Sequence, residues 1–301
     1  MYHYQAYGLI FAVPFECPSM MTAPNGAQAD ISVHEGPVPC YLSDPIVTEP
    51  MFDASARQFL VRGGMRAARF LVTDGKHVTY APNPHAEGQM LEARFTTMVL
   101  PAVLRQRALL VLHATSTVTE HGALAIAGHS GAGKSTTMAG LLADGARMLS
   151  DDVTALQLND DRVVQALPGV AELHLTEAST TGLAVDVTGL LPQPWRRMKT
   201  AVPVTDRMAG EPTALTAVYV LSISDGDGQV RTEEQFGSAK FAALNDCLYG
   251  PVSVHEGSAM FALFRAVLEQ TAIIRVTRPS GTWSVDAVRD AIWQRERAGT
   301  T

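Results

Sequence analysis

Hydrophobic and polar positions give the first part of the chain the pattern of strands. Residues 1 to about 85 hold short apolar or alternating runs separated by Gly, Pro and Asn, and they show no helical period. The pattern predicts strands over residues 4–13, 29–33, 58–61, 68–72 and 77–80, with a hairpin turn at Asp74-Gly75. We therefore expect a small β-rich α+β domain over residues 1–88.

The first long helical pattern covers residues 90–108. Apolar side chains recur there close to a 3.6-residue period, among them Leu91, Phe95, Met98 and Ala102. Pro101 should kink or split this helix, because its ring carries no N–H to donate. We expect residues 89–108 to form a helix that bridges two domains.

Strands and helices alternate in the remainder, residues 109–301. The pattern predicts strands over 109–115, 123–127, 147–150, 153–158, 163–166, 214–223 and 273–276, and helices over 136–143, 238–248, 258–269 and 284–297. Hairpin signals at residues 120–122 and 159–161 favour a mixed sheet rather than a wholly parallel one. Residues 176–212 show no clean period, and a segment of that length is usually either functional or disordered.

One stretch of this second part carries a chemical motif. Residues 128–135, GHSGAGKS, fit G-x-x-x-x-G-K-[ST] and lie between an apolar strand and a helix-forming run, the context that a phosphate-binding loop requires. Backbone N–H groups of such a loop face a phosphate, the lysine reaches the β- and γ-phosphates, and the serine ligates Mg²⁺. The expected nucleotide-binding residues are Gly128, Ser130, Gly131, Ala132, Gly133, Lys134, Ser135 and Thr136.

Acidic and imidazole side chains flank this loop along the sequence. Asp151-Asp152 follows the strand after the loop's helix, and His113 ends the strand before the loop. One carboxylate can complete a Mg²⁺ shell while the other accepts a proton from an attacking hydroxyl, although a single metal-side acid with a bystander fits the pattern too. His113 can assist a carboxylate base, or serve a structural role, as a histidine at a strand end often does.

A basic cluster lies within the segment that lacks a period. Arg196, Arg197 and Lys199 can clamp a γ-phosphate or steer an acidic substrate. A solvated run of loop charges is the alternative explanation.

Composition narrows the class of protein. The 301 residues are 47% hydrophobic and carry a formal net charge of -7, so we expect a globular chain without a basic face for nucleic acid. Cys17, Cys40 and Cys247 are far apart and suggest neither a disulfide framework nor a metal site, so we expect buried thiols in a reducing cytosol. With no signal-peptide pattern and no membrane-length apolar run, a cytoplasmic location is expected.

The order of these elements resembles the catalytic domain of bacterial HPr kinase/phosphorylase. The intervals from His113 to Gly128 and from Gly128 to Asp151 match that family. The resemblance implies a fold of the HPr kinase/PEP-carboxykinase type, with Asp151 as general base, His113 as its partner, and Asp152 with Ser135 near the metal. The family's LE-x-RG-x-G signature corresponds here to PGVAELHL at 168–175, where Glu172 stands in as a further metal candidate. The RG-x-G part is missing, which argues against HPr as substrate and against phosphorylase activity.

A second resemblance covers the whole chain. The stretches YQAYGL at 4–9, FLVTDG at 70–75 and LHA at 112–114, together with the loop, are similar to the HPr-kinase-like proteins of lasso-peptide gene clusters. That family phosphorylates the C-terminal serine of a precursor peptide with ATP and Mg²⁺. It implies a peptide or small protein as partner, whereas nucleic acid and membrane are not expected. HPr or a small metabolite as acceptor stays open, as do homo-oligomerisation and a non-catalytic ATP-binding switch.

Overall fold

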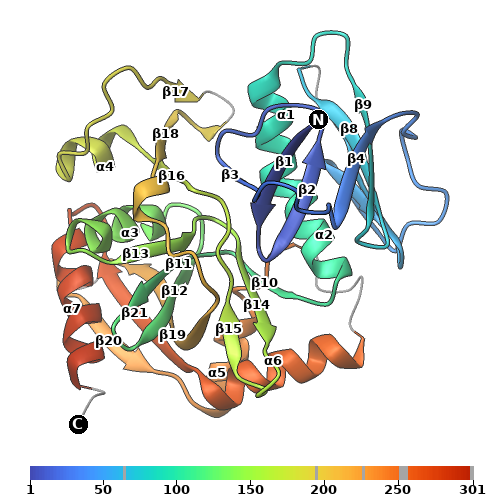
Figure 1. Cartoon of the computed structure of the whole chain (residues 1–301). Helices are drawn as coiled ribbons and strands as arrows, with labels where there is room; N and C mark the ends of the chain where they lie inside the picture. The colour runs from blue at the N-terminus through green and yellow to red at the C-terminus, as the bar shows by residue number, and fades with distance from the viewer. Residues whose placement is uncertain (64–65, 194–195, 226–227, 251–256, 299–301) are drawn as a thin grey trace. The chain divides into compact units, whose positions relative to one another are not determined.

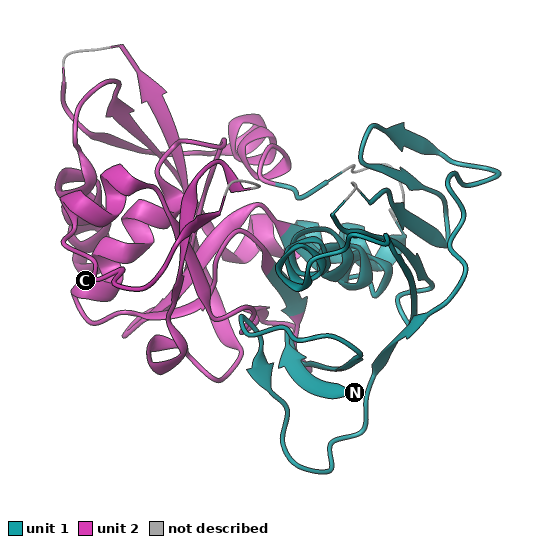
Figure 2. Ribbon diagram, turned by 90° about the horizontal axis from the view of Figure 1, so that it is seen from above, with its two compact units in different colours: residues 1–111, 155–157, 248–265 teal, residues 112–154, 158–247, 266–301 magenta. Residues whose placement is uncertain are grey.

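The computed structural model describes residues 1–63, 66–193, 196–225, 228–250 and 257–298 (Figure 1). Two compact units divide the chain. Unit 1 holds residues 1–111, 155–157 and 248–265, and unit 2 holds residues 112–154, 158–247 and 266–301 (Figure 2). The helical run expected to bridge two domains therefore belongs to unit 1. Residues 248–265 belong to unit 1 as well, although they come late in the sequence.

Unit 1 is built on one sheet with strand order β3-β1-β2-β4-β9-β8-β7-β6-β5. Its strands are β1 (Tyr2–Ala6), β2 (Leu9–Val13), β3 (Met21–Thr22), β4 (Ile31–Glu35), β5 (Val47–Glu49), β6 (Phe52–Ala54), β7 (Gln58–Val61), β8 (Ala68–Thr73) and β9 (His77–Pro82). The predicted Asp74-Gly75 turn is confirmed, with both residues at positive φ. The run expected over residues 4–13 is instead a hairpin, because Tyr7 and Gly8 also take positive φ.

The helical run of unit 1 is interrupted, as the presence of Pro101 led us to expect. It consists of α1 (Gly88–Arg94), a π-helical turn η1 (Phe95–Val99) and α2 (Leu100–Gln106). Pro101 cannot donate a hydrogen bond to the Thr97 carbonyl, and the Tyr249 hydroxyl donates to that oxygen at 2.7 Å instead. The helix buries Phe95, which packs edge-on against Phe11 and Phe15 of the sheet's core.

Unit 2 is built on a mixed sheet. Its strands include β11 (Ala114–Thr119), β12 (Gly122–Gly128), β13 (Arg147–Ser150), β15 (Val164–Ala166), β19 (Thr213–Ser224), β20 (Arg231–Glu234) and β21 (Ala272–Pro279). β19 runs parallel to β12 and β21, whereas β11 is antiparallel to β12 and β13. β10 (Leu110–Leu112) and β14 (Thr154–Leu158) are neighbouring strands. The predicted fold class, an α/β domain with a mixed sheet and a β-rich N-terminal part, is confirmed.

Two helices of unit 2 pack on this sheet and on each other. They are α3 (Lys134–Ala143) and α7 (Val285–Ala298), which lie side by side in Figure 1. Leu141 of α3 and Ile292 of α7 share one buried core with Leu124, Tyr219 and Ile274 of the central strands. Gly145 follows α3 at positive φ, a conformation that commonly ends a helix. Two more helices, α5 (Gly237–Asn245) and α6 (Ser258–Gln270), precede α7 in the chain.

The segment without a sequence period contains several short elements. It contains α4 (Glu177–Gly182), β17 (Pro192–Gln193) and β18 (Lys199–Pro203), and a 3₁₀ turn follows over Thr205–Arg207. β18 pairs with β17 and with β16 (Glu172–Leu175) to form a separate small sheet. These elements are short, which explains why no period marked them.

Two further expectations concern the thiols and the membrane. Cys17 and Cys247 are buried as expected, but Cys40 is exposed. Among the described residues no helix is long and apolar enough to cross a membrane.

Candidate active site

The predicted phosphate loop connects β12 to α3, and its glycines are required by the backbone. Gly128, Gly131 and Gly133 all have positive φ, at 138°, 87° and 109°. A Cβ on Gly128 would lie 2.6 Å from the Leu221 carbonyl oxygen on the neighbouring strand β19. The turn therefore needs glycine for both conformation and close approach.

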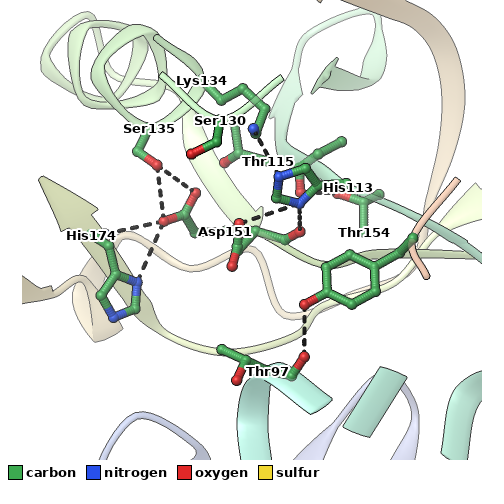
Figure 3. Close-up of polar contacts among 12 residues, drawn as sticks. Thr97, His113, Thr115, Ser130, Lys134, Ser135, Asp151, Thr154 and His174 are labelled. Carbon is green, nitrogen blue, oxygen red and sulfur yellow. Dashed lines mark hydrogen bonds and ion pairs between the residues drawn. The ribbon is translucent and has the colours of Figure 1, made fainter. Parts of the chain in front are cut away.

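Lys134 begins α3 and turns its side chain back across the loop. Its ammonium donates to the Gly128 carbonyl at 2.8 Å and to the His129 carbonyl at 3.4 Å, and lies 3.1 Å from His113 Nε2 (Figure 3). The residue is only 8% exposed, and burial lowers the pKa of its ammonium although Asp152 and Asp151 oppose that shift. A buried cation thus faces the cavity above the loop.

Asp151 is the buried member of the acidic pair. It accepts a hydrogen bond from Ser135 Oγ at 3.1 Å (Oδ1) and 3.2 Å (Oδ2) and another from the His174 backbone N–H at 3.1 Å (Figure 3). Burial favours a higher pKa for this carboxyl, but hydrogen bonding and charge from His174 outweigh it and hold the pKa below its usual range. Asp151 is therefore an ionised group and a weak proton acceptor.

Asp152 is the accessible member of the pair, with its side chain 37% exposed. His113 Nδ1 lies 3.1 Å from the Asp152 carbonyl oxygen and 3.3 Å from its Oδ1. Asp152 has φ 68°, and the Val153 N–H donates to the Asp151 carbonyl at 2.8 Å, which closes a γ-turn of the rare positive-φ kind around it. Backbone strain of this kind, a positive φ at a residue other than glycine, is found most often at functional sites.

These contacts correct the pairing implied by the sequence resemblance. His113 was expected to support Asp151, but it contacts Asp152; Asp152 was expected beside Ser135, but Ser135 contacts Asp151. With Nδ1 donating to Asp152, the His113 ring presents Nε2 as acceptor to Lys134, so one tautomer satisfies both contacts. The His113 backbone is fixed by its N–H, which donates to the Cys247 carbonyl at 2.7 Å.

Glu172, the further metal candidate, is not among the residues that line the cavity. Its Oε1 lies 2.7 Å from Nε2 of His174, and the other ring nitrogen, Nδ1, lies 3.7 Å from Asp151 Oδ2. Neither ring nitrogen is aligned for a hydrogen bond, and the contacts become ion pairs when His174 is protonated. His174 thus stands between Glu172 and Asp151.

His174 was missed by the sequence analysis, although a signal for it exists. Glu172 and His174 are two residues apart on one strand and therefore share a face of the sheet. The imidazole is buried, which favours a lower pKa, but Asp151 and Glu172 outweigh burial and raise the pKa of His174. A protonated His174 neutralises part of the acidic charge at this end of the site.

We expect His174→Gln to lower the free energy of unfolding by about 3 kcal/mol near pH 6, because it leaves two carboxylates without their buried cation. Folding raises the pKa of His174, so its contribution is complete below the unfolded value of about 6.5 and is lost as pH rises through the folded-state pKa. Urea unfolding of both proteins from pH 5.5 to 9 in metal-free buffer measures this.

The matched control for that measurement is His121→Gln. His121 lies 3.4 Å from the largely exposed Glu120, and a surface pair of this kind contributes little. A stability difference for His174→Gln that stays constant across the pH range would contradict the buried ion pair.

The basic cluster faces the same cavity, as the clamp interpretation required. Arg196, Arg197 and Lys199 all line it, and Arg197 Nη1 donates to the hydroxyl of Ser130 in the loop at 3.1 Å. Arg197 and Met198 both have positive φ, at 54° and 60°, a costly conformation for side chains other than glycine. The structure thus brings the predicted cluster to the loop.

Arg278 adds a cation that the sequence analysis did not single out. From the end of β21 its guanidinium donates to the Ala132 carbonyl through Nε at 2.8 Å and to the Gly131 carbonyl through Nη2 at 3.2 Å. The cavity has a volume of about 440 Å³. Five cationic side chains line it against two carboxylates, which favours a polyanionic ligand. The cations are Lys134, Arg196, Arg197, Lys199 and Arg278.

The donor set around Ser135 fits a hard divalent cation. Within the described part of the chain, no group of three or more His, Cys, Asp or Glu side chains could hold a metal ion. Mg²⁺ does not need such a cage, since it keeps several waters and takes one or two protein oxygens together with substrate phosphates. The adjacent oxygens of Ser135 and Asp151 meet that requirement.

Comparison with known proteins adds little to this geometry. No family model and no curated protein matches the chain. Among solved structures it is similar to the Hpr(Ser) kinase/phosphatase from Coxiella burnetii, with 12% sequence identity, a TM-score of 0.31, and coverage of 63% of this chain and 94% of that one. At this level of similarity the match carries no argument about activity.

Proposed function

We propose that the chain is a phosphotransferase that moves the γ-phosphoryl group of ATP to a serine hydroxyl of a peptide. One observation carries the proposal: a single phosphate loop faces two carboxylates with different surroundings. Asp151 is buried and bonded to the loop's Ser135, whereas Asp152 is accessible and oriented by His113. A nucleotide-binding switch needs the first acid but not a second one with an imidazole beside it.

The loop and its cations hold the triphosphate. Backbone N–H groups at the start of α3 face the phosphates, and Lys134 supplies a buried positive charge at the β/γ end. Arg197, anchored on Ser130, clamps the outer phosphate oxygens, a contribution that grows as charge develops on the transferring group. Ser135 and Asp151 would hold Mg²⁺, which supplies charge neutralisation and orientation of the phosphates.

Asp152 accepts the proton of the attacking hydroxyl. Its exposure allows an acceptor to reach the carboxylate, and His113 fixes the carboxylate's direction from Nδ1. Asp151 is less suited to that step, because it is buried and its pKa is held low. The proposal therefore exchanges the roles that the sequence resemblance implied for the two aspartates.

The acceptor class in this proposal comes from the sequence resemblance. A peptide with a C-terminal serine, such as a lasso-peptide precursor, is the first candidate, and the cations Arg196 and Lys199 at the cavity suit a nearby carboxylate. HPr and small metabolites are the alternative acceptors.

The test is an acceptor panel with the full chain, Mg²⁺ and ATP. The panel contains a precursor peptide ending in serine, the same peptide ending in alanine, HPr and free serine, and mass spectrometry locates the phosphate. We expect multiple-turnover phosphorylation of the serine peptide alone. ATP binding with at most one hydrolysis per chain, and no acceptor phosphorylated, would replace the proposal with a regulatory switch.

A further inference from the structure

The cavity above the phosphate loop extends to a second segment that the phosphoryl chemistry does not use. This segment connects β21 to α7 and contributes Thr282, Trp283 and Ser284 to the cavity wall, followed by Val285 and Val288 of α7. Trp283 is 47% exposed although it is the largest side chain in this wall. An exposed indole in a polyanion cavity needs an explanation other than core packing.

The Trp283 ring is held in a defined position. It lies against Gly182 at the end of α4, where an added Cβ would come within 2.5 Å of the ring carbons Cη2 and Cζ2. α4 is itself tied to the phosphate-loop helix, because the hydroxyls of Ser179 and Thr136 are hydrogen-bonded at 2.8 Å. On the other side of the segment, Arg278 bonds the carbonyls of Gly131 and Ala132. The indole is thus a fixed platform relative to the loop.

The place of the platform along the bound triphosphate follows from the loop. Lys134 and its neighbour His113 mark the β/γ end. Thr136 and Thr137 follow the metal-side Ser135 in α3. They line the cavity together with the β21–α7 segment. The nucleoside must leave the triphosphate on the side away from the β/γ end.

We propose that Trp283 is the stacking platform for the nucleobase of the nucleoside triphosphate, an inference that rests on the proposed function. One face of the base lies on the indole, Val285 supplies apolar contact, and the hydroxyls of Thr282 and Ser284 offer hydrogen bonds to the ribose or base edge. Because every base has an aromatic face, the platform supplies affinity for a base more than choice among bases.

Calorimetric binding to the full chain tests the assignment with two probes, ADP and inorganic tripolyphosphate. Trp283→Ala should weaken ADP binding by about tenfold or more and leave tripolyphosphate binding unchanged, because only ADP carries a base. Trp283→Phe keeps an aromatic face and should restore most of the ADP affinity. Equal loss for both probes, or unchanged ADP affinity, would overturn the assignment.

A fluorescence measurement gives an independent readout. The chain has three tryptophans, Trp195, Trp283 and Trp293, so the double variant Trp195→Phe/Trp293→Phe leaves Trp283 alone. ADP should quench its emission while tripolyphosphate does not. The matched control is Trp293→Phe alone, since Trp293 bonds Asp144 through Nε1 at 2.8 Å and does not line the cavity. Absence of quenching on a protein that binds ADP contradicts the platform.

These outcomes separate the two proposals. A wild-type chain that binds neither ADP nor tripolyphosphate defeats both. A chain that transfers no phosphate but binds ADP through Trp283 defeats only the phosphotransferase. A chain that phosphorylates the serine peptide with unchanged ADP affinity after Trp283→Ala defeats only the platform.

Discussion

Asp152→Asn is expected to lower kcat for phosphoryl transfer by about 10²- to 10⁴-fold, the usual contribution of a general base. The amide keeps the size of the side chain but cannot accept the hydroxyl proton. Because Ser135 bonds Asp151 and Asp152 is partly exposed, ADP affinity and folding stability should stay near those of the wild type. Steady-state kinetics with the serine peptide and calorimetry with ADP measure the two effects.

Asp151→Asn is the matched control, since it changes the neighbouring residue in the same way. Asp151 contacts Ser135 and the buried His174, so its loss should raise the Mg²⁺ concentration needed for half-maximal rate and lower the unfolding free energy. If Asp151→Asn instead abolishes kcat at saturating Mg²⁺ while Asp152→Asn stays active, the roles are those that the sequence resemblance implied.

Much of this site could be read from local sequence. The motif at 128–135, its strand and helix, and the neighbouring hairpins depend on residues close together in the chain, where glycine positions and apolar periods report the backbone directly. The basic cluster was recognised from its charges and lies at the cavity, but the sequence did not show how it reaches the loop. Arg197 reaches Ser130 from a positive-φ turn just before the short β18, and neither the turn nor the strand leaves a period in the sequence.

The functions of the two aspartates could not be read in this way. Successive side chains on a strand point in opposite directions, so a pair identifies a site without saying which member faces the loop. Here the positive-φ γ-turn at Asp152 redirects the chain toward His113, and buried contacts with Ser135 and His174 hold Asp151. Such contacts join segments far apart in sequence, and single-residue patterns do not encode them.

Lys134→Met should lower kcat/KM for ATP by about 10²- to 10³-fold, the cost of removing one preorganised charge from a phosphate site. Methionine preserves the apolar stem and the packing at the start of α3, so the loss reports the ammonium alone. Folding stability should stay equal or rise, because burial already disfavours this charge and lowers its pKa. Kinetics at varied ATP and thermal unfolding test the two parts.

Lys199→Met is the control that tests whether the effect belongs to Lys134 itself or to positive charge anywhere in the cavity. Lys199 lines the same cavity, but Lys134 is the lysine that bonds the loop carbonyl of Gly128 and contacts His113. Lys199→Met should therefore lower kcat/KM for ATP much less than Lys134→Met does. Lys134→Arg should not rescue activity, since a planar guanidinium cannot replace a compact ammonium within those short contacts. Equal effects of Lys134→Met and Lys199→Met would mean that the cavity attracts ATP by net charge, and the loop lysine would then have no special part in transfer.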